Sequence, residues 1–598
     1  MNGSDRKAKP GYVMISKVPE VLRLAVGAVG LAWLLAGTCG MSAAEWYVSP
    51  DGDDAQIGNA DLPWRTISRA VQAAQAGDTV HVGAGYYSER VSTVRNGAPD
   101  ARIRFRGEGA VVMHGWIINH SYITIENFEI TRHSGASQLD AYVRVNNDGD
   151  FFEMIGCTVR DGIHVVIPDA WFFAADGCIS NHAVNFVARG FSAGQTLYIG
   201  KATDTQSSIN NGSYTIVMAE PSRLLLQPGV QDEGPVPVYL SASMVFGLYL
   251  STRSEGCIIR SNVFRNLGYD SLLITGLGHL IEDNWIEATS GWDAMHFGGT
   301  NHVFRRNVIR NSPLVVFQNS PDAMENYQVP YRDVTFSNNM VINFAGVLAS
   351  QKAPYTMSGL SLIRNVFVDV GRFNFTQRDT LVENNTFVRV AKKSYPNVAR
   401  SSHPIGVDTT VGATNVVIRN NIFVDCGEPS GGVSVSQVGW YEVKGDQGPL
   451  VMEGNFVAGG PPDYGPKAGW PESMMLNGGD PGFVNPEDPL GPDGLPFTAD
   501  DGLRLRADSK LLGAGVGGVT IGAYELPFVE RVPLVIERGG DGKVVLRWPR
   551  SMWEWRVETA RNLAGPWTPL DLLQVEKGAF VEAEAAVNGE FEWFRLAR

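Results

Sequence analysis

The sequence lacks several features that would place it in large enzyme classes. It has five cysteines in 598 residues, no Cys/His set at zinc-site spacing, no glycine-rich phosphate loop and no serine in a nucleophile elbow. Long amphipathic helical patterns are nearly absent, apart from residues 67–76. With 67 glycines and 32 prolines, the composition is typical of a turn-rich all-β protein.

Positive charge is also scarce. The chain has 49 lysines and arginines against 63 aspartates and glutamates, which gives a formal net charge of −14. Because nucleic acids are polyanions, this balance predicts no nucleic-acid partner. An acidic polysaccharide stays open as a partner, since a basic cleft can lie on an acidic protein.

Hydrophobic runs are short. Five basic residues precede one apolar run from Leu24 to Ala36, which is short for a membrane anchor. Small residues follow at 42–44, just before Glu45, as at a cleavage site. We predict that residues 1–44 are a signal peptide, that the mature protein is secreted, periplasmic or extracellular, and that it has no stable membrane partner.

An asparagine followed by large apolar residues recurs down the chain. Steps between copies include 284 − 262 = 22, 307 − 284 = 23, 365 − 339 = 26 and 385 − 365 = 20 residues. A period near two dozen, with strand-like alternation, predicts a β-helix whose asparagines stack in an internal ladder. The copies begin at Asn262, Asn284, Asn307, Asn339, Asn365, Asn385 and Asn421.

The remaining cysteines fit this interior. We expect Cys157, Cys178, Cys257 and Cys426 to be buried free thiols. Cys157 and Cys178 are 178 − 157 = 21 residues apart, and each follows a glycine. This spacing predicts that these two thiols stack inside adjacent coils.

The segment 46–90 carries a resemblance to known proteins. It reads Trp46-Tyr47-Val48-Ser49-Pro50-Asp51-Gly52 and later Gly85-Tyr86-Tyr87. This resembles the opening of secreted right-handed parallel β-helix proteins of the pectate-lyase-like superfamily. The resemblance implies a first strand, a capping helix over the open end of the core, and then the coils.

We therefore predict an all-β chain in three parts after the signal peptide. A right-handed parallel β-helix spans 45–527. A small β subdomain interrupts it at about 183–245, where the pattern changes to antiparallel strands with tight turns. Residues 528–598 form a β-sandwich that resembles accessory modules of secreted bacterial enzymes. We expect a monomer.

Alternation along one strand of each coil predicts an outward-facing row of side chains. Residues expected to point inward are Leu248, Leu272, Met295 and Val347. Residues expected to point outward are His164, Tyr249, Leu273, His296, Leu348, Asn374 and Asp408. A long row of this kind is suited to a chain-like ligand, so Tyr249, Asn374 and Asp408 are expected to bind substrate.

Lys352 and Arg378 form a basic constellation. They are 378 − 352 = 26 residues apart, the same step as Asn339 to Asn365, which predicts one rung on adjacent coils. Two cations side by side lower the pKa of the lysine and make it a better base. That chemistry is suited to β-elimination on a uronic acid polymer, where positive charge stabilises the enolate-like intermediate.

The same stretch, Ser350 to Lys352 and Arg378 to Asn385, is loosely similar to the catalytic stretch of the alginate lyase and chondroitinase B family. The resemblance implies Lys352 as base and Arg378 as its cationic partner. It also implies a calcium ion that neutralises the substrate carboxylate. Asp322 and Glu325 are the acidic residues considered for that ion.

Asp270 and Asp293 form an acidic constellation. They stand in matching Tyr/Trp-Asp-Ser/Ala contexts, 293 − 270 = 23 residues apart, and His296 follows Asp293. Stacked carboxylates raise each other's pKa, which would provide a general acid. The two aspartates could also hold calcium, or each could cap the turn before its strand.

Three functions remain open. The first is a polysaccharide lyase that uses Lys352 and Arg378, with His296 or Asp293 assisting. The second is a glycoside hydrolase that uses Asp270, Asp293 or Asp322. The third is a non-catalytic carbohydrate-binding surface protein. Gln318, Asp270 and His403 are further residues expected to contact the substrate.

Overall fold

The computed structural model describes residues 43–135, 140–201, 207–288, 293–311, 322–344, 346–350, 357–392, 403–427, 441–444, 450–458, 472–473 and 476–525, and several strands between 535 and 597. The predicted signal peptide therefore lies almost entirely outside the described residues. In the part of the chain that is described, no helix is long and apolar enough to cross a membrane.

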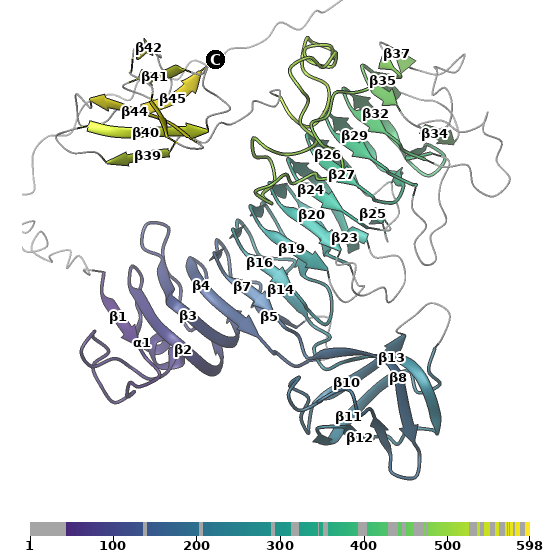
Figure 1. Cartoon of the computed structure of the whole chain (residues 1–598). Coiled ribbons are helices and arrows are strands. Elements are labelled where there is room, and N and C mark those ends of the chain that lie inside the picture. The colour runs from purple at the N-terminus through teal and green to yellow at the C-terminus, as the bar shows by residue number, and fades with distance from the viewer. Residues whose placement is uncertain are drawn as a thin grey trace, which may run out of the picture. The chain divides into compact units, whose positions relative to one another are not determined.

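The main body is a parallel β-helix with three strands per coil, which confirms the predicted fold class (Figure 1). In the regular coils a strand pairs in parallel with the strand three places later, as in β14–β17, β15–β18 and β16–β19. The two coils of this example consist of β14 (Phe246–Leu250), β15 (Ile258–Arg260), β16 (Val263–Arg265), β17 (Leu272–Ile274), β18 (Leu280–Glu282) and β19 (Trp285–Ala288).

We call the first strand position of each coil the groove sheet. Its strands are β5 (Ala141–Val145), β14, β17, β20 (Met295–Thr300), the first half of β23 (Asp322–Ser337) and β25 (Gly346–Ser350). Farther along the chain, β28 (Phe373–Phe375), β31 (Ile405–Asp408) and β34 (Tyr441–Lys444) pair in parallel as a separate sheet.

The other two strand positions complete each coil. The second sheet continues through β6 (Glu153–Ile155), β21 (Val303–Arg305), β26 (Ser358–Ile363), β29 (Arg378–Glu383), β32 (Thr414–Arg419), β35 (Leu450–Glu453) and β37 (Glu472–Ser473). The third continues through β7 (Thr158–Arg160), β22 (Val308–Asn311), β24 (Met340–Ile342), β27 (Val366–Val368), β30 (Thr386–Val388), β33 (Ile422–Val424), β36 (Phe456–Ala458) and β38 (Leu476–Asn477).

A helix closes the first end of the solenoid core. β1 (Glu45–Val48) pairs with β2 (Thr79–Ser92), and the long β2, β3 (Ile103–Ile118) and β4 (Ile123–Thr131) form the first coils. Between β1 and β2, α1 (Ile67–Ala73) begins at an N-cap, Thr66, whose side chain accepts from the Arg69 amide. Its Ile67, Ala70 and Val71 are buried in the main core, as the resemblance implied for a cap.

Identical residue types stack inside the coils. Phe387 lies over Phe423 with ring centroids 4.6 Å apart and an interplanar angle of 2°. Phe304 and Phe336 stack in the same way at 4.5 Å. Phe387 and Phe423 stand two residues after a repeated asparagine, so the Asn-aromatic phrase of the sequence forms a polar stack and an aromatic stack, whereas Phe304 and Phe336 precede their asparagines by three residues.

The polar stack is the predicted asparagine ladder. The Nδ2 of Asn307 donates to the Oδ1 of Asn339 at 2.9 Å and to the Ile281 carbonyl at 2.9 Å. The Asn307 Oδ1 in turn accepts from both nitrogens of Asn284. The same bonds join Asn262, Asn284, Asn307, Asn339, Asn365, Asn385, Asn421 and Asn455.

A closed antiparallel barrel interrupts the solenoid. It begins at His164, earlier than the position near 183 taken from the sequence, and ends at Ser241. Its strands are β8 (His164–Phe173), β9 (Cys178–Ser180), β10 (Thr196–Lys201), β11 (Gly212–Glu220), β12 (Arg223–Gln227) and β13 (Glu233–Ser241). The barrel has its own apolar core.

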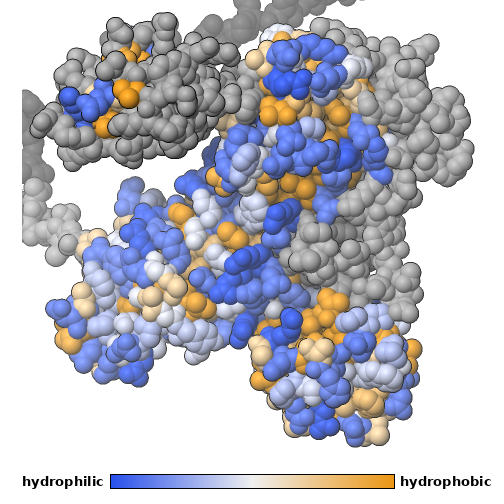
Figure 2. All heavy atoms as spheres, viewed as in Figure 1, coloured by the Kyte–Doolittle hydropathy of each residue, from blue (hydrophilic) through white to orange (hydrophobic). Residues whose placement is uncertain are grey.

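This boundary corrects two predictions. His164 belongs to the barrel and not to a coil strand, and burial lowers its pKa to about 4. Cys178 begins a barrel strand, so it does not stack on Cys157 inside the solenoid. The four cysteines are nevertheless free and buried, as predicted. Figure 2 shows hydrophilic residues spread over the described coils, with hydrophobic patches between them and on the barrel.

The chain ends in two small antiparallel sheets. One contains β39 (Val535–Arg538), β40 (Lys543–Pro549), β44 (Phe580–Ala586) and β43 (Val575–Lys577). The other contains β42 (Thr568–Pro569), β41 (Arg556–Ala560) and β45 (Trp593–Ala597). Leu546, Val557 and Ala583, from both sheets, share a buried cluster, so the strand pattern that predicted a sandwich here corresponds to two packed sheets.

The ladder should dominate stability. Replacing Asn307 with alanine removes hydrogen bonds to two neighbouring coils and leaves buried partners unsatisfied, so we expect a loss of about 2–4 kcal/mol in the free energy of unfolding. Asn374, an exposed asparagine on β28, is the matched control, and Asn374→Ala should change stability by less than about 0.5 kcal/mol. Urea unfolding measures both. Equal effects would show that the ladder does not stabilise the coils.

Candidate functional site

The outward row predicted for the groove sheet exists. Parallel register aligns Arg144, Tyr249, Leu273, His296 and Glu325 on successive strands. The preceding residues Leu248, Leu272 and Met295 are buried in the solenoid core. Tyr249, Leu273 and His296 therefore lie on the outer face, as alternation predicted.

Besides His164, Leu348 is a second residue of the outward prediction that is wrong, and the inward position predicted for Val347 is wrong with it. The register pairs Leu348 with Met324 and Ala349 with Glu325. Since Glu325 aligns with His296, the outward position on β25 is Ala349, and Leu348 occupies the inward row. The preceding turn is one residue longer than the sequence alignment assumed.

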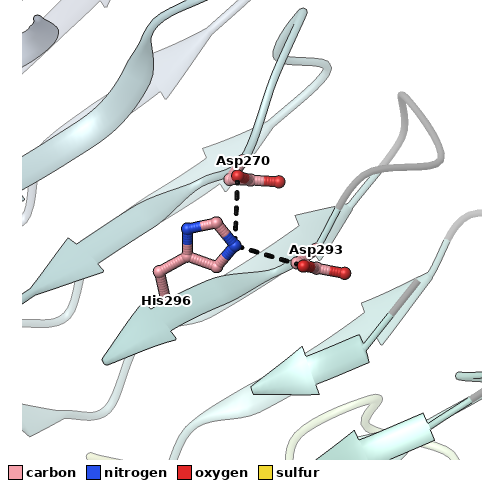
Figure 3. A group of neighbouring side chains, drawn as sticks. All are labelled: Asp270, Asp293 and His296. Carbon is pink, nitrogen blue, oxygen red and sulfur yellow. Dashed lines mark hydrogen bonds and ion pairs between the residues drawn. The ribbon is translucent and has the colours of Figure 1, made fainter. Parts of the chain in front are cut away.

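Asp270, Asp293 and His296 come together on two neighbouring coils (Figure 3). Each aspartate stands two residues before the inward residue of its strand, Leu272 or Met295. The His296 Nε2 lies 3.2 Å from the Asp293 Oδ2 and 3.6 Å from the Asp270 Oδ2. One imidazole nitrogen therefore faces both carboxylates, and the two aspartates lie on adjacent coils, as predicted from the 23-residue step.

The three side chains differ in their access to solvent. Asp270 is 1% exposed and the His296 side chain 6% exposed, whereas the Asp293 side chain is 18% exposed. Asp293 is therefore the group through which a ligand would meet the cluster. His296 holds Asp293 in place, and Asp270 lies behind both.

Sequence reasoning missed the residues that support this cluster. The ring of Phe246 packs against the imidazole of His296 with centroids 5.6 Å apart, and against Tyr269 at 5.3 Å. The Tyr239 hydroxyl of the barrel donates to the Gly268 carbonyl at 2.6 Å, two residues before Asp270. No sequence pattern links the barrel to this turn, because the contact is made across a long insertion.

The cluster supplies a mixed set of metal-ligand atoms. One atom each from Asp270, Asp293 and His296 lies within 4.8 Å of the others. Calcium takes six to eight oxygen ligands, whereas zinc accepts imidazole together with carboxylate. These three donors therefore do not fit calcium by themselves, and we derive no step through that ion.

The acidic residues considered for calcium lie on the next coil. Glu325 is in direct register with His296. Asp293 and Asp322 each stand three residues before a member of that pair, so the same register would align them. The backbone thus brings both positions beside the cluster, and calcium binding stays a prediction that depends on their carboxylates.

The basic pair is not arranged as predicted. Arg378 is exposed at the start of β29, and its register partner on the preceding coil is Ser358. The predicted rung shared by Lys352 and Arg378 is therefore wrong. Lys352 lies outside the described residues. Arg378 is three coils from His296, roughly 14 Å along the solenoid.

The other substrate-binding predictions have different outcomes. Asn374 is exposed between the buried Phe373 and Phe375, so it faces outward as predicted. Asp408 ends β31 and accepts from the Thr410 amide at 3.1 Å, which makes it a turn cap. His403 is half-buried just before β31. Gln318 lies outside the described residues.

The donor set yields a prediction about calcium. Because two carboxylates and an imidazole are a poor calcium site, we expect no saturable calcium uptake at this cluster when the protein, stripped with a chelator, is titrated by calorimetry. A zinc titration serves as the positive control for metal access. Calcium uptake that Glu325→Gln abolishes would contradict this and confirm the ion that the resemblance implied.

Comparisons with known proteins match only part of the chain. Residues 50–94 match the family described as "Protein of unknown function (DUF1565)". The chain is 35% identical to the uncharacterized protein YwoF of Bacillus subtilis over 81 residues, which is 13% of this chain and 17% of that protein. It is 35% identical to the pectate lyase PEL9 of Emericella nidulans over 75 residues, 12% of this chain and 18% of the lyase.

The chain thus spans less than a fifth of the length of these curated relatives in the matched segments. Among solved structures, a rhamnogalacturonan lyase aligns at a TM-score of 0.41 and 12% identity, over 63% of this chain and 87% of that one. This likeness is too low to carry an argument about activity. The N-terminal match and the parallel β-helix confirm the predicted resemblance: the chain is similar to β-helix proteins of the pectate-lyase-like superfamily.

Proposed function

We propose that this chain is an exported enzyme that cleaves a uronic-acid-containing polysaccharide by β-elimination, with proton transfer at Asp293 and with His296 as its positioning residue. The observation that carries the proposal is the carboxylate–imidazole pair on the outer face of the groove sheet, 3.2 Å apart, with only the aspartate reaching solvent. A parallel β-helix offers a long straight face, which is suited to a chain-like substrate.

Cations on both sides of the pair support an acidic substrate. Arg144 lies three coils before His296 in the same outward row. On the other side, exposed Arg332 and Arg378 occupy one register column that begins at Thr300, four residues after His296. A polyanion lying along the groove would have a cation within reach on each side of Asp293.

The roles of the two central residues follow from their exposure. Asp293 is the catalytic residue, because a group that moves a proton must lie within hydrogen-bond reach of the substrate. His296 is a positioning residue that donates from Nε2 to the ionised Asp293 and orients its other oxygen. Asp293 takes the proton from the carbon next to the substrate carboxylate, which leaves an enolate-like charge on the substrate. The bond from the next carbon to the glycosidic oxygen then breaks as the double bond forms, and the leaving oxygen takes up a proton.

Hydrolysis is the second candidate, because Asp270 and Asp293 have carboxylate oxygens within 4.8 Å of each other. Retaining glycosidases place their carboxyl groups about 5–5.5 Å apart. Hydrolysis needs both carboxylates at the sugar, however, and Asp270 is 1% exposed. Abstraction of the proton in an elimination needs only one exposed group, so the exposure of Asp293 favours it.

Lys352 and Arg378 remain an alternative centre of the same chemistry. Arg378 lies three coils from His296, too far for it and Asp293 to work on one glycosidic bond. The two centres therefore make opposite predictions for single substitutions. Loss of a proton-transfer group should lower kcat only if that group belongs to the centre that performs the reaction.

The decisive variant is Asp293→Asn, which keeps the size and the hydrogen bond but removes the base. On a panel of uronate polymers, we expect the wild type to release unsaturated, ultraviolet-absorbing ends, and Asp293→Asn to lower kcat by about a hundredfold or more. Lys352→Ala should keep kcat within about threefold, since it leaves this pair intact.

The opposite pattern, with Lys352→Ala inactive and Asp293→Asn active, would move the reaction to the basic centre. Reducing ends without unsaturation, abolished by Asp270→Asn, would establish hydrolysis instead. A wild type that binds a polymer but yields no product from any polymer would show a carbohydrate-binding protein.

A further inference from the structure

The outward row of the groove sheet holds a second built feature, on the coils before the Asp293 pair. Arg144 on β5 lies in register with Tyr249 on β14, and its guanidinium carbon is 5.9 Å from the centroid of the Tyr249 ring. Both side chains are half-buried. The arginine is therefore partly supported by an aromatic face while its end stays accessible.

A hydrogen-bonded relay fixes the inner side of this guanidinium. The Arg144 Nε donates to the Asn146 Oδ1 at 2.9 Å. The Asn146 Nδ2 donates to the Asn119 Oδ1 at 2.7 Å, and the Asn119 Nδ2 donates to the Ser92 Oγ at 2.8 Å. Residues of three coils thus form a hydrogen-bond network that holds one arginine, whereas an ordinary solvated side chain has no such network.

Arg144 differs in its charge balance from several paired arginines of the other two sheets. Arg260, Arg305 and Arg306 all pair with Glu282, and Arg160 pairs with Glu129. Within the described part of the chain, Arg144 has no carboxylate within ion-pair distance. Its Nε bonds to a neutral amide, so no described carboxylate compensates the charge of the guanidinium.

We infer that Arg144 and Tyr249 form a subsite that binds the carboxylate of a uronic acid residue of the substrate. The relay occupies Nε and so leaves the two terminal nitrogens of the fork for a bidentate pair with one carboxylate. The Tyr249 ring, next along the row, offers an apolar face to the same sugar. The subsite lies three coils from Asp293, roughly 14 Å along the groove.

This inference rests on the proposed acidic substrate but not on the cleavage step. The subsite selects the charge of the bound chain at a distance from the reacting bond. It is therefore tested by binding, in an Asp293→Asn background that does not degrade the ligand. The probes are a uronic acid oligosaccharide of about six residues and the same oligosaccharide with its carboxyl groups reduced to alcohols.

The test compares Arg144→Gln, Arg144→Lys and Arg265→Gln by calorimetry. Arg144→Gln should weaken binding of the charged oligosaccharide by about tenfold or more, since a charge-assisted bidentate pair is lost, and should leave binding of the reduced one unchanged. Arg144→Lys should recover part of the affinity but not all of it. Arg265, exposed on β16 of the third sheet, is the matched control and should have no effect.

The inference is overturned if Arg144→Gln binds the charged oligosaccharide like the parent, or if no uronic acid oligosaccharide binds to the parent. It is also overturned if both probes lose affinity equally, because the arginine would then have a structural role. Charge-dependent binding through Arg144 without any unsaturated product from the wild type would keep the subsite and refute the cleavage. Unsaturated products from the wild type, together with unaltered binding in Arg144→Gln, would refute the subsite and keep the proposed cleavage.

Discussion

The asparagine ladder is the constraint on which the rest of the structure depends. As Asn307 shows, the side-chain nitrogen donates to the asparagine of the next coil and to a backbone carbonyl, and the side-chain oxygen accepts from the asparagine of the preceding coil. The bonds from Asn307 to Asn339 are formed although 32 residues separate them, and those from Asn365 to Asn385 across 20. Coil length can therefore vary while the register of the strands is held.

This constraint explains why residues on the strands can form a site while the segments between the strands vary in length. The groove sheet presents one outward position per coil at a fixed spacing, so Arg144, Tyr249, His296 and Glu325 are aligned whatever lies between them in sequence. The barrel illustrates the tolerance best. The Cys157 amide donates to the Asn262 Oδ1 across 105 residues, and the ladder starts there without a break.

The sequence predicted the parts of the site that share a ladder step. Asp270 and Asp293 belong to the coils of Asn284 and Asn307, whose step of 23 residues equals their own separation, so their proximity was predictable. Lys352 and Arg378 belong to the coils of Asn365 and Asn385, whose step is 20. Their separation of 26 matched the wrong pair of asparagines, and the true partner of Arg378 is Ser358.

Other features could not be predicted, because they depend on contacts and not on period. The burial of Asp270 follows from packing around Phe246 and Tyr269 and from the barrel contact at Gly268. The isolation of Arg144 from carboxylates becomes visible only when neighbouring coils are placed side by side. Solvent exposure and neighbouring charges decide which of several stacked polar residues can act on a ligand. The repeat period predicts neither of these two properties.

The account requires the substrate to lie along the groove sheet, with the scissile bond at Asp293. A structure of the Asp293→Asn variant with a bound uronic acid oligosaccharide tests this most directly. The account predicts a sugar chain that crosses successive coils, with the carbon next to a uronate carboxylate within about 3.5 Å of the residue 293 side chain. A chain bound on the second or third sheet, on the barrel, or centred on residue 352 would contradict it.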